Sequence, residues 1–246
     1  MPHDFTDRTV VVLGGGSGIG LEVARRVVAA GARVVLGGRG EEKLAAAAGE
    51  LGDAAHWRRV DTTDQASLIA FFAGLTDFDG VDRVHHLFTP AASYRTGPML
   101  ELSDEDAESA FESKFWGQYY AVKHAAPLLA PDASVVLMSG AASVRPVGAA
   151  PSYVACNAAI EGLGRGLAVE LAPVRVNVVS PGMVDGNLWS QRPAEVREPA
   201  AATWREANLL QRAGTEGEIA EAVLFLFSNG YTTGSTLYPD GGYALR

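Results

Sequence analysis

The stretch that decides the fold is Leu13-Gly14-Gly15-Gly16-Ser17-Gly18-Ile19-Gly20. It follows the apolar run Thr9–Leu13 and opens an amphipathic stretch, Gly18–Ala30, with helical spacing. Glycines at such a turn let the backbone approach a pyrophosphate, which then lies among the unpaired N–H groups of the helix N-terminus. A glycine cluster alone also fits an ordinary turn, but its place between strand and helix predicts a dinucleotide site at Gly14, Ser17, Gly18, Ile19 and Gly20.

The same alternation of apolar runs and helical patterns continues along all 246 residues. Most of the apolar runs show little polar alternation, which is typical of strands that are buried on both faces. The predicted strands are Thr9–Leu13, Arg33–Leu36, His56–Val60, Arg83–Phe88, Ser134–Met138, Arg175–Val179 and Ser235–Tyr238. The predicted helices are Gly18–Ala30, Glu41–Leu51, Gln65–Leu75, Asp104–Leu129, Tyr153–Leu171 and Glu216–Phe227. We therefore predict one α/β domain over residues 1–246, a Rossmann-like, doubly wound parallel sheet of about seven strands.

The composition limits the classes of partner. A net charge of −9 argues against nucleic acid or an anionic membrane surface, since both reward clustered Lys and Arg. No apolar run approaches the roughly 20 residues that span a bilayer, and the N-terminus lacks the basic and apolar regions of a secretion signal. One cysteine suits a reducing compartment, so we predict a cytoplasmic protein, and we predict no metal site.

The least regular segment is the stretch 185–210, which carries Trp189, Pro193, Pro199 and Trp204. We interpret it as an excursion from the carboxyl edge of the sheet, where open α/β folds place their ligands. The segments Ala92–Pro98, Ala141–Ala150 and Met183–Leu210 would wall a largely apolar pocket, which favours an apolar or aromatic small molecule as substrate. Arg145 could meet an anionic group there or simply face water.

Several further segments complete a family pattern. Ser139 follows the predicted strand Ser134–Met138, and Tyr153 opens the motif Tyr153-Val154-Ala155-Cys156-Asn157. Pro181-Gly182-Met183-Val184 follows the next strand, and the chain closes with Asp240-Gly241-Gly242. Together with the glycine turn these segments resemble the short-chain dehydrogenase/reductase family, whose signature is Tyr-x-x-x-Lys after an upstream serine.

The resemblance implies an oxidoreductase that interconverts a carbonyl and an alcohol by hydride transfer with a nicotinamide dinucleotide. It makes Tyr153 the general acid and base, and it makes Ser139 the residue that holds the substrate oxygen. It also implies a homotetramer or homodimer, built on the long predicted helices Asp104–Leu129 and Tyr153–Leu171.

The resemblance assigns cofactor contacts as well. It places Asp61 and Thr62 beside the adenine, although an aspartate that caps the next helix would look the same unless Asp64 does so instead. Beside the nicotinamide it places Pro181, Gly182 and Val184. At the end of the second strand Gly38 stands where an NAD-preferring site has an acid, and Arg39 follows. The positive charge suits a 2′-phosphate and favours NADP(H) over NAD(H); the alternative is a solvated surface arginine.

Two departures from the family pattern are reciprocal. Asn157 stands where the family has its lysine, and aligning Gly117 with the family's Asn-x-x-Gly places Lys114 where it has the asparagine. An unperturbed tyrosine has a pKa of about 10, so work near neutral pH needs a cation that lowers it. We therefore predict that Lys114 supplies the displaced charge to Tyr153, while Asn157 binds the ribose or a water.

The alternatives concern whether such a site still works. Lys114 could be a solvated lysine on a protein that has lost redox activity and serves as a cofactor-binding or regulatory protein on the same fold. Non-redox chemistry of the halohydrin dehalogenase kind fits less well, because the glycine turn is intact. Cys156 suits a packing residue better than a nucleophile. His85 and His86 receive no role, since neighbours on a strand face opposite ways and at least one belongs to the core.

Overall fold

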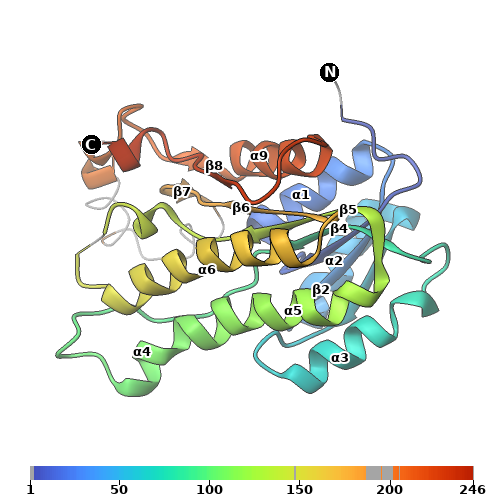
Figure 1. Ribbon diagram of the computed structural model, residues 1–246, viewed down its shortest axis with the longest axis horizontal. Coiled ribbons are helices and arrows are strands. Elements are labelled where there is room, and N and C mark those ends of the chain that lie inside the picture. The colour runs from blue at the N-terminus through green and yellow to red at the C-terminus, as the bar shows by residue number, and fades with distance from the viewer. Residues whose placement is uncertain (1–2, 147, 187–194, 196–201, 205, 246) are drawn as a thin grey trace.

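The core of the molecule is a seven-stranded parallel sheet between two layers of helices (Figure 1). The computed structural model describes residues 3–146, 148–186, 195, 202–204 and 206–245. The strands are β1 (Thr9–Leu13), β2 (Arg33–Gly38), β3 (Ala55–Arg59), β4 (Val84–Thr89), β5 (Leu129–Met138), β6 (Arg175–Val179) and β9 (Thr236–Leu237). Their order is β3-β2-β1-β4-β5-β6-β9. Strands β2 and β3 thus lie on one side of β1, and the later strands β4, β5, β6 and β9 lie on the other side. The predicted doubly wound α/β fold is confirmed.

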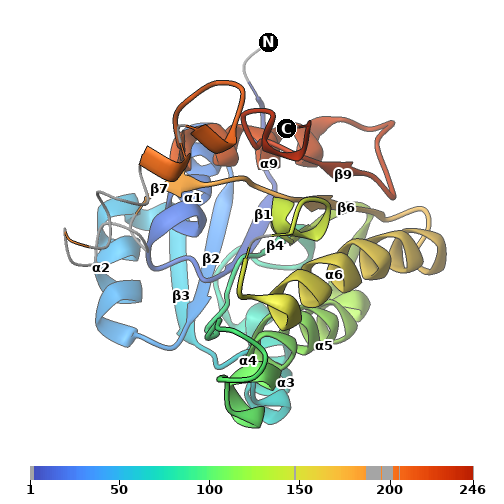
Figure 2. The ribbon, with the colours of Figure 1, turned by 90° about the vertical axis from the view of Figure 1, so that its left-hand side faces the viewer.

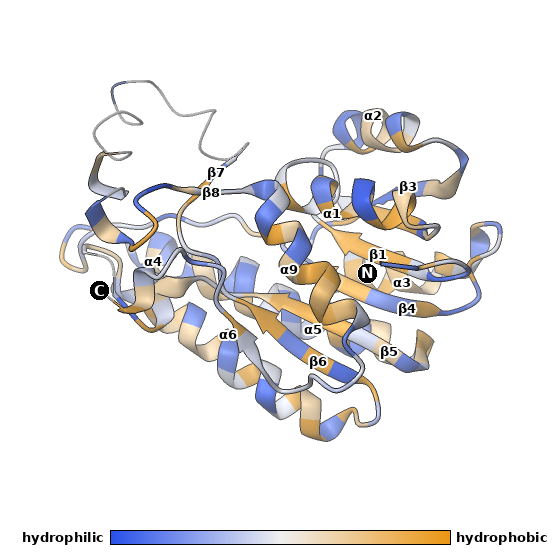
Figure 3. Cartoon of the chain, turned by 90° about the horizontal axis from the view of Figure 1, so that it is seen from above, coloured by the Kyte–Doolittle hydropathy of each residue, from blue (hydrophilic) through white to orange (hydrophobic). Residues whose placement is uncertain are grey.

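Helices cover both faces of the sheet (Figure 2). One layer holds α1 (Gly18–Ala29), α2 (Glu41–Leu51) and α9 (Glu216–Ser228). The other holds α3 (Gln65–Ala73), α4 (Asp104–Ala110), α5 (Gly117–Ala125) and α6 (Pro151–Glu170). Strand β1 contributes to both layers: Val10 and Val12 pack into the first, and Val11 and Leu13 into the second. This explains the continuous apolar runs, which lie as hydrophobic strands between the helices in Figure 3.

The prediction of one helix over Asp104–Leu129 is wrong in two respects. Its middle, Phe111–Trp116, is a π-helix between α4 and α5, and Leu129 begins β5 instead of ending the helix. Pro127 and Pro131 explain the early end, because proline cannot donate the hydrogen bond that continues a helix. A π-helical turn changes the direction of the side chains it carries and is frequent at functional sites. Lys114 lies on it.

The segment after β6 differs from the prediction in detail. A short parallel ribbon, β7 (Val184–Asp185) with β8 (Gly214–Thr215), was not predicted. Within the predicted excursion 185–210, Trp189, Pro193 and Pro199 lie outside the described residues, whereas Trp204 is buried. In the described part of the chain no helix has the length and apolar character to cross a membrane.

The two histidines of β4 belong to the sheet. The Nδ1 atom of His85 accepts a hydrogen bond from the Thr9 N–H of the neighbouring strand at 3.1 Å. His86 is buried, with its ring centroid 5.2 Å from that of Phe5 and 4.7 Å from that of Phe227. Its Nδ1 atom has no hydrogen-bond partner among the described residues, and burial lowers the pKa of His86 to about 3. His86 is therefore a neutral core residue.

Candidate active site

The glycine turn between β1 and α1, residues 14–20, leaves open a space that larger side chains would fill. We call this turn the glycine cradle. Gly14 has a φ of 97°, in the region that favours glycine. A Cβ atom on Gly20 would lie 2.2 Å from the Gly14 carbonyl oxygen, so no larger residue fits there. Beside the turn is a cavity of about 320 Å³ that includes Gly14, Ser17, Arg39 and Asp61 in its lining. The turn therefore fits a dinucleotide, with its pyrophosphate at the N-terminus of α1.

Charged side chains also line this cavity. Arg39 is one of them, and Lys43, which sequence reasoning missed although it lies one helical turn beyond, is another. Asp64 caps α3, its Oδ1 accepting from the Ala66 N–H at 2.9 Å, so Asp61 is not the cap. Burial alone would raise the pKa of Asp61, but hydrogen bonds from Thr63 and the nearby arginines lower it overall.

The residues predicted beside the nicotinamide lie at the end of β6. The Pro181 carbonyl accepts from the Ala141 N–H at 2.8 Å, which ties this end to the segment after β5. A Cβ atom on Gly182 would lie 2.8 Å from the Asp240 Cα atom, so the closing segment needs glycine there. Val184 begins the β7 ribbon. These residues share the carboxyl edge of the sheet with the glycine cradle.

Lys114 and Asn157, the two residues predicted to have exchanged places, lie in direct contact. The Lys114 ammonium comes from the π-helix and donates to the Asn157 Oδ1 atom of α6 and, at 2.9 Å, to the Ser139 carbonyl oxygen. Lys114 is only 4 % exposed, which excludes the solvated lysine of the alternative reading. The Nζ atom lies 5.1 Å from the ring centroid of Tyr153. Asn157 in turn donates from Nδ2 to the Tyr153 carbonyl oxygen at 2.9 Å.

These contacts set the protonation of the corner formed by Lys114, Tyr153 and Asn157. Burial by itself would raise the pKa of Tyr153, but the Lys114 ammonium and hydrogen bonds from Tyr94 and Asn157 outweigh burial and lower it. Burial also lowers the pKa of Lys114, while the nearby Tyr153, Cys156 and Glu161 favour the ammonium. The two oxygen acceptors of Lys114 favour the charged form as well.

Ser139 lies in the corner, but its hydroxyl turns away from Tyr153. The Oγ atom is 2.9 Å from the Asn157 carbonyl oxygen and 3.2 Å from the Glu161 carboxylate. The position that faces the phenol is the next one: a Cβ atom on Gly140 would lie 3.0 Å from the Tyr153 hydroxyl oxygen. The contacts therefore give no support to Ser139 as the residue that holds the substrate oxygen. Consecutive residues leaving a strand point opposite ways, and the sequence places glycine at the position that faces the site.

Sequence reasoning missed two buried polar residues that organise this corner. Gln118 donates to the carbonyl oxygens of Lys114 and Met138 and accepts from the Met138 N–H and the Thr89 hydroxyl. Glu161 accepts from the hydroxyls of Ser139, Ser143, Ser180 and Tyr238. Burial and the Glu161 carboxylate raise the pKa of Tyr238 to about 12. The sequence did hold a signal for both residues, because Gln118 and Glu161 are polar residues at inward-facing positions of their helices.

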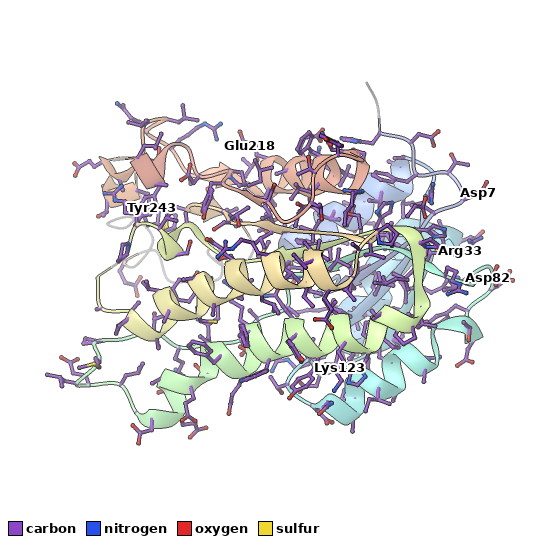
Figure 4. The ribbon with its side chains drawn as sticks, in the orientation of Figure 1. Asp7, Arg33, Asp82, Lys123, Glu218 and Tyr243 are labelled. Carbon is purple, nitrogen blue, oxygen red and sulfur yellow. The ribbon has the colours of Figure 1, made fainter. Side chains whose placement is uncertain are left out.

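Two other residues have structural roles. The Arg145 guanidinium donates to the carbonyl oxygens of Ala207 and Tyr243, and its Cζ atom lies 4.4 Å from the Tyr243 ring centroid. Figure 4 shows Tyr243 near the end of the molecule where α6 begins. Arg145 thus joins the C-terminal segment to the segment after β5, a role neither alternative foresaw. Cys156 is fully buried, and burial raises its pKa to about 11, which makes it unreactive.

The comparisons with known proteins identify the class. A family model described as enoyl-(acyl carrier protein) reductase matches residues 14–244. Among curated relatives, a cis-4-hydroxycyclohexanecarboxylate dehydrogenase of Sinomonas cyclohexanicum is 32% identical over 99% of both chains. A galactitol 2-dehydrogenase of Cereibacter sphaeroides is 35% identical over 95% of this chain and 94% of its own. The chain belongs to the short-chain dehydrogenase/reductase family of oxidoreductases.

Two further matches bear on the extent of the likeness and on the site. A short-chain type dehydrogenase/reductase of Sinorhizobium fredii, of uncharacterised activity, is 33% identical over 98% of this chain, which spans only 44% of that protein. An NADPH-bound short-chain oxidoreductase from Pseudomonas aeruginosa PAO1, described as containing an atypical catalytic center, is 29% identical with a TM-score of 0.91. That alignment covers 100% of both chains.

Proposed function

We propose that this protein is an NADP(H)-dependent oxidoreductase that interconverts a carbonyl and an alcohol, with Tyr153 as the general acid and base. The observation that carries the proposal is the contact between Lys114 and Asn157 beside the Tyr153 ring. A buried ammonium at this place has a chemical use, because it holds the phenol of the half-buried Tyr153 ready to lose its proton. A protein that only binds a cofactor has no need of this arrangement.

The roles of the chain's residues follow from their contacts. The glycine cradle and Arg39 would hold the dinucleotide, which supplies or accepts the hydride when bound. Tyr153 gives its proton to the substrate oxygen during reduction and takes it back during oxidation. Lys114 stabilises the phenolate that forms, and Asn157 orients the ammonium through its Oδ1 atom. Asn157 would also reach the ribose or a water, as the resemblance predicts.

Several features support NADP(H) and a small-molecule substrate. Arg39 and Lys43 line the cavity where a 2′-phosphate would lie, and the Pseudomonas protein of similar structure binds NADPH. The curated relatives carry the names of dehydrogenases of a cyclic hydroxy acid and of a sugar alcohol. We propose an apolar or aromatic carbonyl or alcohol as substrate, a cytoplasmic location, and a homotetramer or homodimer, with nucleic acid and membranes excluded as partners.

The test removes the charge and then moves it. Lys114→Met keeps the stem of the side chain but not the ammonium, and we expect turnover to fall by at least roughly a hundredfold while NADPH affinity changes little. Lys123→Met, at an exposed position of α5, is the matched control and should leave turnover unchanged. The exchange Lys114→Asn with Asn157→Lys should recover part of the lost activity, because it returns a cation to the same small volume.

The measurements are steady-state turnover over a panel of ketones and secondary alcohols and NADPH binding by fluorescence. Full activity in Lys114→Met would refute the role given to the ammonium. NADPH binding by the unaltered protein without any turnover across the panel would favour the redox-inactive, cofactor-binding alternative. The binding measurement also shows that each variant is folded.

A further inference from the structure

The phenol of Tyr153 faces a position without a side chain. A Cβ atom on Gly140 would lie 3.0 Å from the Tyr153 hydroxyl oxygen, and about as near the Asn157 amide, at 3.4 Å and 3.5 Å. The hydroxyl of Ser139, the residue before Gly140, is directed to the Asn157 carbonyl and Glu161. A tyrosine that exchanges its proton with a substrate gains from a second donor at its oxygen, because the developing phenolate is stabilised by hydrogen bonds. Gly140 has no side chain that could supply one.

Tyr94, from the loop after β4, lies against the same phenol. Its ring stacks on that of Tyr153 with centroids 4.8 Å apart and planes inclined by 24°. The Lys114 Nζ atom lies 5.9 Å from the Tyr94 ring centroid and 5.1 Å from that of Tyr153, so one cation serves both rings. A hydrogen bond from the Tyr94 hydroxyl to Tyr153 is among the causes that lower the Tyr153 pKa.

The loop that carries Tyr94 is held in place on both sides of it. The Ser93 N–H donates to the Ser113 hydroxyl at 3.2 Å, and this hydroxyl donates back to the Ser93 carbonyl at 2.6 Å. On the other side the Arg95 N–H donates to the Ser109 hydroxyl at 3.1 Å. Ser113 immediately precedes Lys114 on the π-helix, so one segment positions both the cation and Tyr94. A phenol held this way loses little freedom when it makes its hydrogen bond.

We propose that the Tyr94 hydroxyl takes the place that a side chain at position 140 would otherwise fill, donating a hydrogen bond to the Tyr153 oxygen as that oxygen releases its proton. This rests on the proposed function. In reduction, the O–H bond of Tyr153 breaks and a new O–H bond forms on the substrate oxygen, which receives the electron pair of its carbonyl as the hydride reaches carbon. The Tyr153 oxygen keeps its bonding pair, and Tyr94 shares but does not transfer its own proton. Tyr94 is thus a positioning residue that acts through Tyr153.

The test uses Tyr94→Phe, which keeps the stacked ring and removes only the hydroxyl. We expect turnover at pH 7 to fall roughly tenfold, the value for loss of one hydrogen bond to a charged group. The pH profile of turnover should shift to higher pH, because the Tyr153 phenolate loses a donor. Tyr231→Phe, at a fully exposed tyrosine, is the matched control and should change neither quantity.

A second readout does not depend on turnover. Tyrosine labelled with ¹³C at Cζ reports the Tyr153 titration by NMR, with the signal assigned through Tyr153→Phe, and its pKa should rise in Tyr94→Phe. Gly140→Ser in the Tyr94→Phe background should restore both the pH profile and the titration, because its hydroxyl would reach the same oxygen. An unchanged Tyr153 titration in Tyr94→Phe would overturn the proposal. Absence of turnover in the unaltered protein would instead count against the proposed function, and the titration would still decide the role of Tyr94.

Discussion

The glycine cradle and the corner formed by Lys114, Tyr153 and Asn157 lie on the same carboxyl edge of the sheet but are built differently. The cradle is made of backbone from one continuous stretch, in which Gly14 takes a left-handed conformation and Gly20 leaves room for a carbonyl oxygen. The corner is made of side chains from separate elements, with Lys114 on the π-helix and Tyr153 and Asn157 on α6. A site made of backbone allows few substitutions. In a site made of side chains, by contrast, a chemical group can come from a different position of the chain, provided that it reaches the same place.

Lys114 and Asn157 illustrate the second case. Lysine reaches far on a flexible stem, and a π-helical turn alters where its side chain is directed. The amide of Asn157 accepts from the ammonium and donates to the Tyr153 carbonyl, so it uses both of its polar atoms. The cation and the amide are thus neighbours although they come from separate elements.

The largest effect we predict breaks the cradle. In Gly20→Ala the new methyl group would lie 2.2 Å from the Gly14 carbonyl oxygen, a backbone atom that cannot move aside. Overpacking of this kind costs about 3 kcal/mol, so we expect NADPH affinity to fall by roughly a hundredfold or more. Calorimetric titration with NADPH measures it.

Gly49→Ala is the matched control, since a Cβ atom there would meet nothing within 4 Å. It lies inside α2 and should raise the free energy of unfolding by about 0.5–1 kcal/mol without changing NADPH affinity. Equal loss of affinity in both variants would show that the cradle is not the binding site.

The next prediction tests whether the corner depends on its buried support. Gln118→Leu leaves the Lys114 carbonyl, both backbone groups of Met138 and the Thr89 hydroxyl without their partner. We expect the free energy of unfolding to fall by about 3 kcal/mol, and turnover to fall more than NADPH affinity. Urea unfolding and steady-state kinetics measure the two effects, with Gln65→Leu at the exposed start of α3 as control. A larger loss of NADPH affinity than of turnover would contradict the separation of corner and cradle.

The cradle could be predicted from sequence, because glycines between a strand and a helix indicate a backbone turn that a pyrophosphate can approach closely. The corner could be predicted only in part. The spacing to Gly117 indicated Lys114, and the structure shows Lys114 in contact with Asn157. The direction of the Ser139 hydroxyl could not be predicted, because a shift of one residue at the end of β5 decides whether position 139 or 140 faces Tyr153. Gln118 stood at an inward-facing position of a predicted helix, but its contact with Met138 could not be predicted, because Met138 is 20 residues away.

A pH effect on stability must be kept apart from the pH effect on the corner. His86 has a folded-state pKa of about 3, below its ordinary 6.5, so its neutral form stabilises the fold above pH 6.5. As pH falls from 6.5 toward 3, only the unfolded state takes up the proton and stability is lost, by about 3 kcal/mol at pH 4. His86→Phe should abolish this loss. Urea unfolding at pH 7 and pH 4 measures it; an unchanged difference between the two values would show that another group is responsible.

The smallest effect that we predict concerns Arg39, a side chain that lines the cavity beside the glycine cradle. Arg39→Ala removes a charge that would face a 2′-phosphate but leaves the glycines intact. We expect NADPH affinity to fall roughly tenfold, the value of about one charge-assisted hydrogen bond, with NADH affinity unchanged. Competition binding with both nucleotides measures the ratio, and Arg25→Ala on the exposed surface of α1 is the control. Equal losses for NADPH and NADH would mean that Arg39 contacts a part common to both nucleotides. A selective loss would show that the cradle binds the dinucleotide through its backbone and distinguishes NADPH from NADH through a side chain, so that the cofactor preference can change without altering the fold.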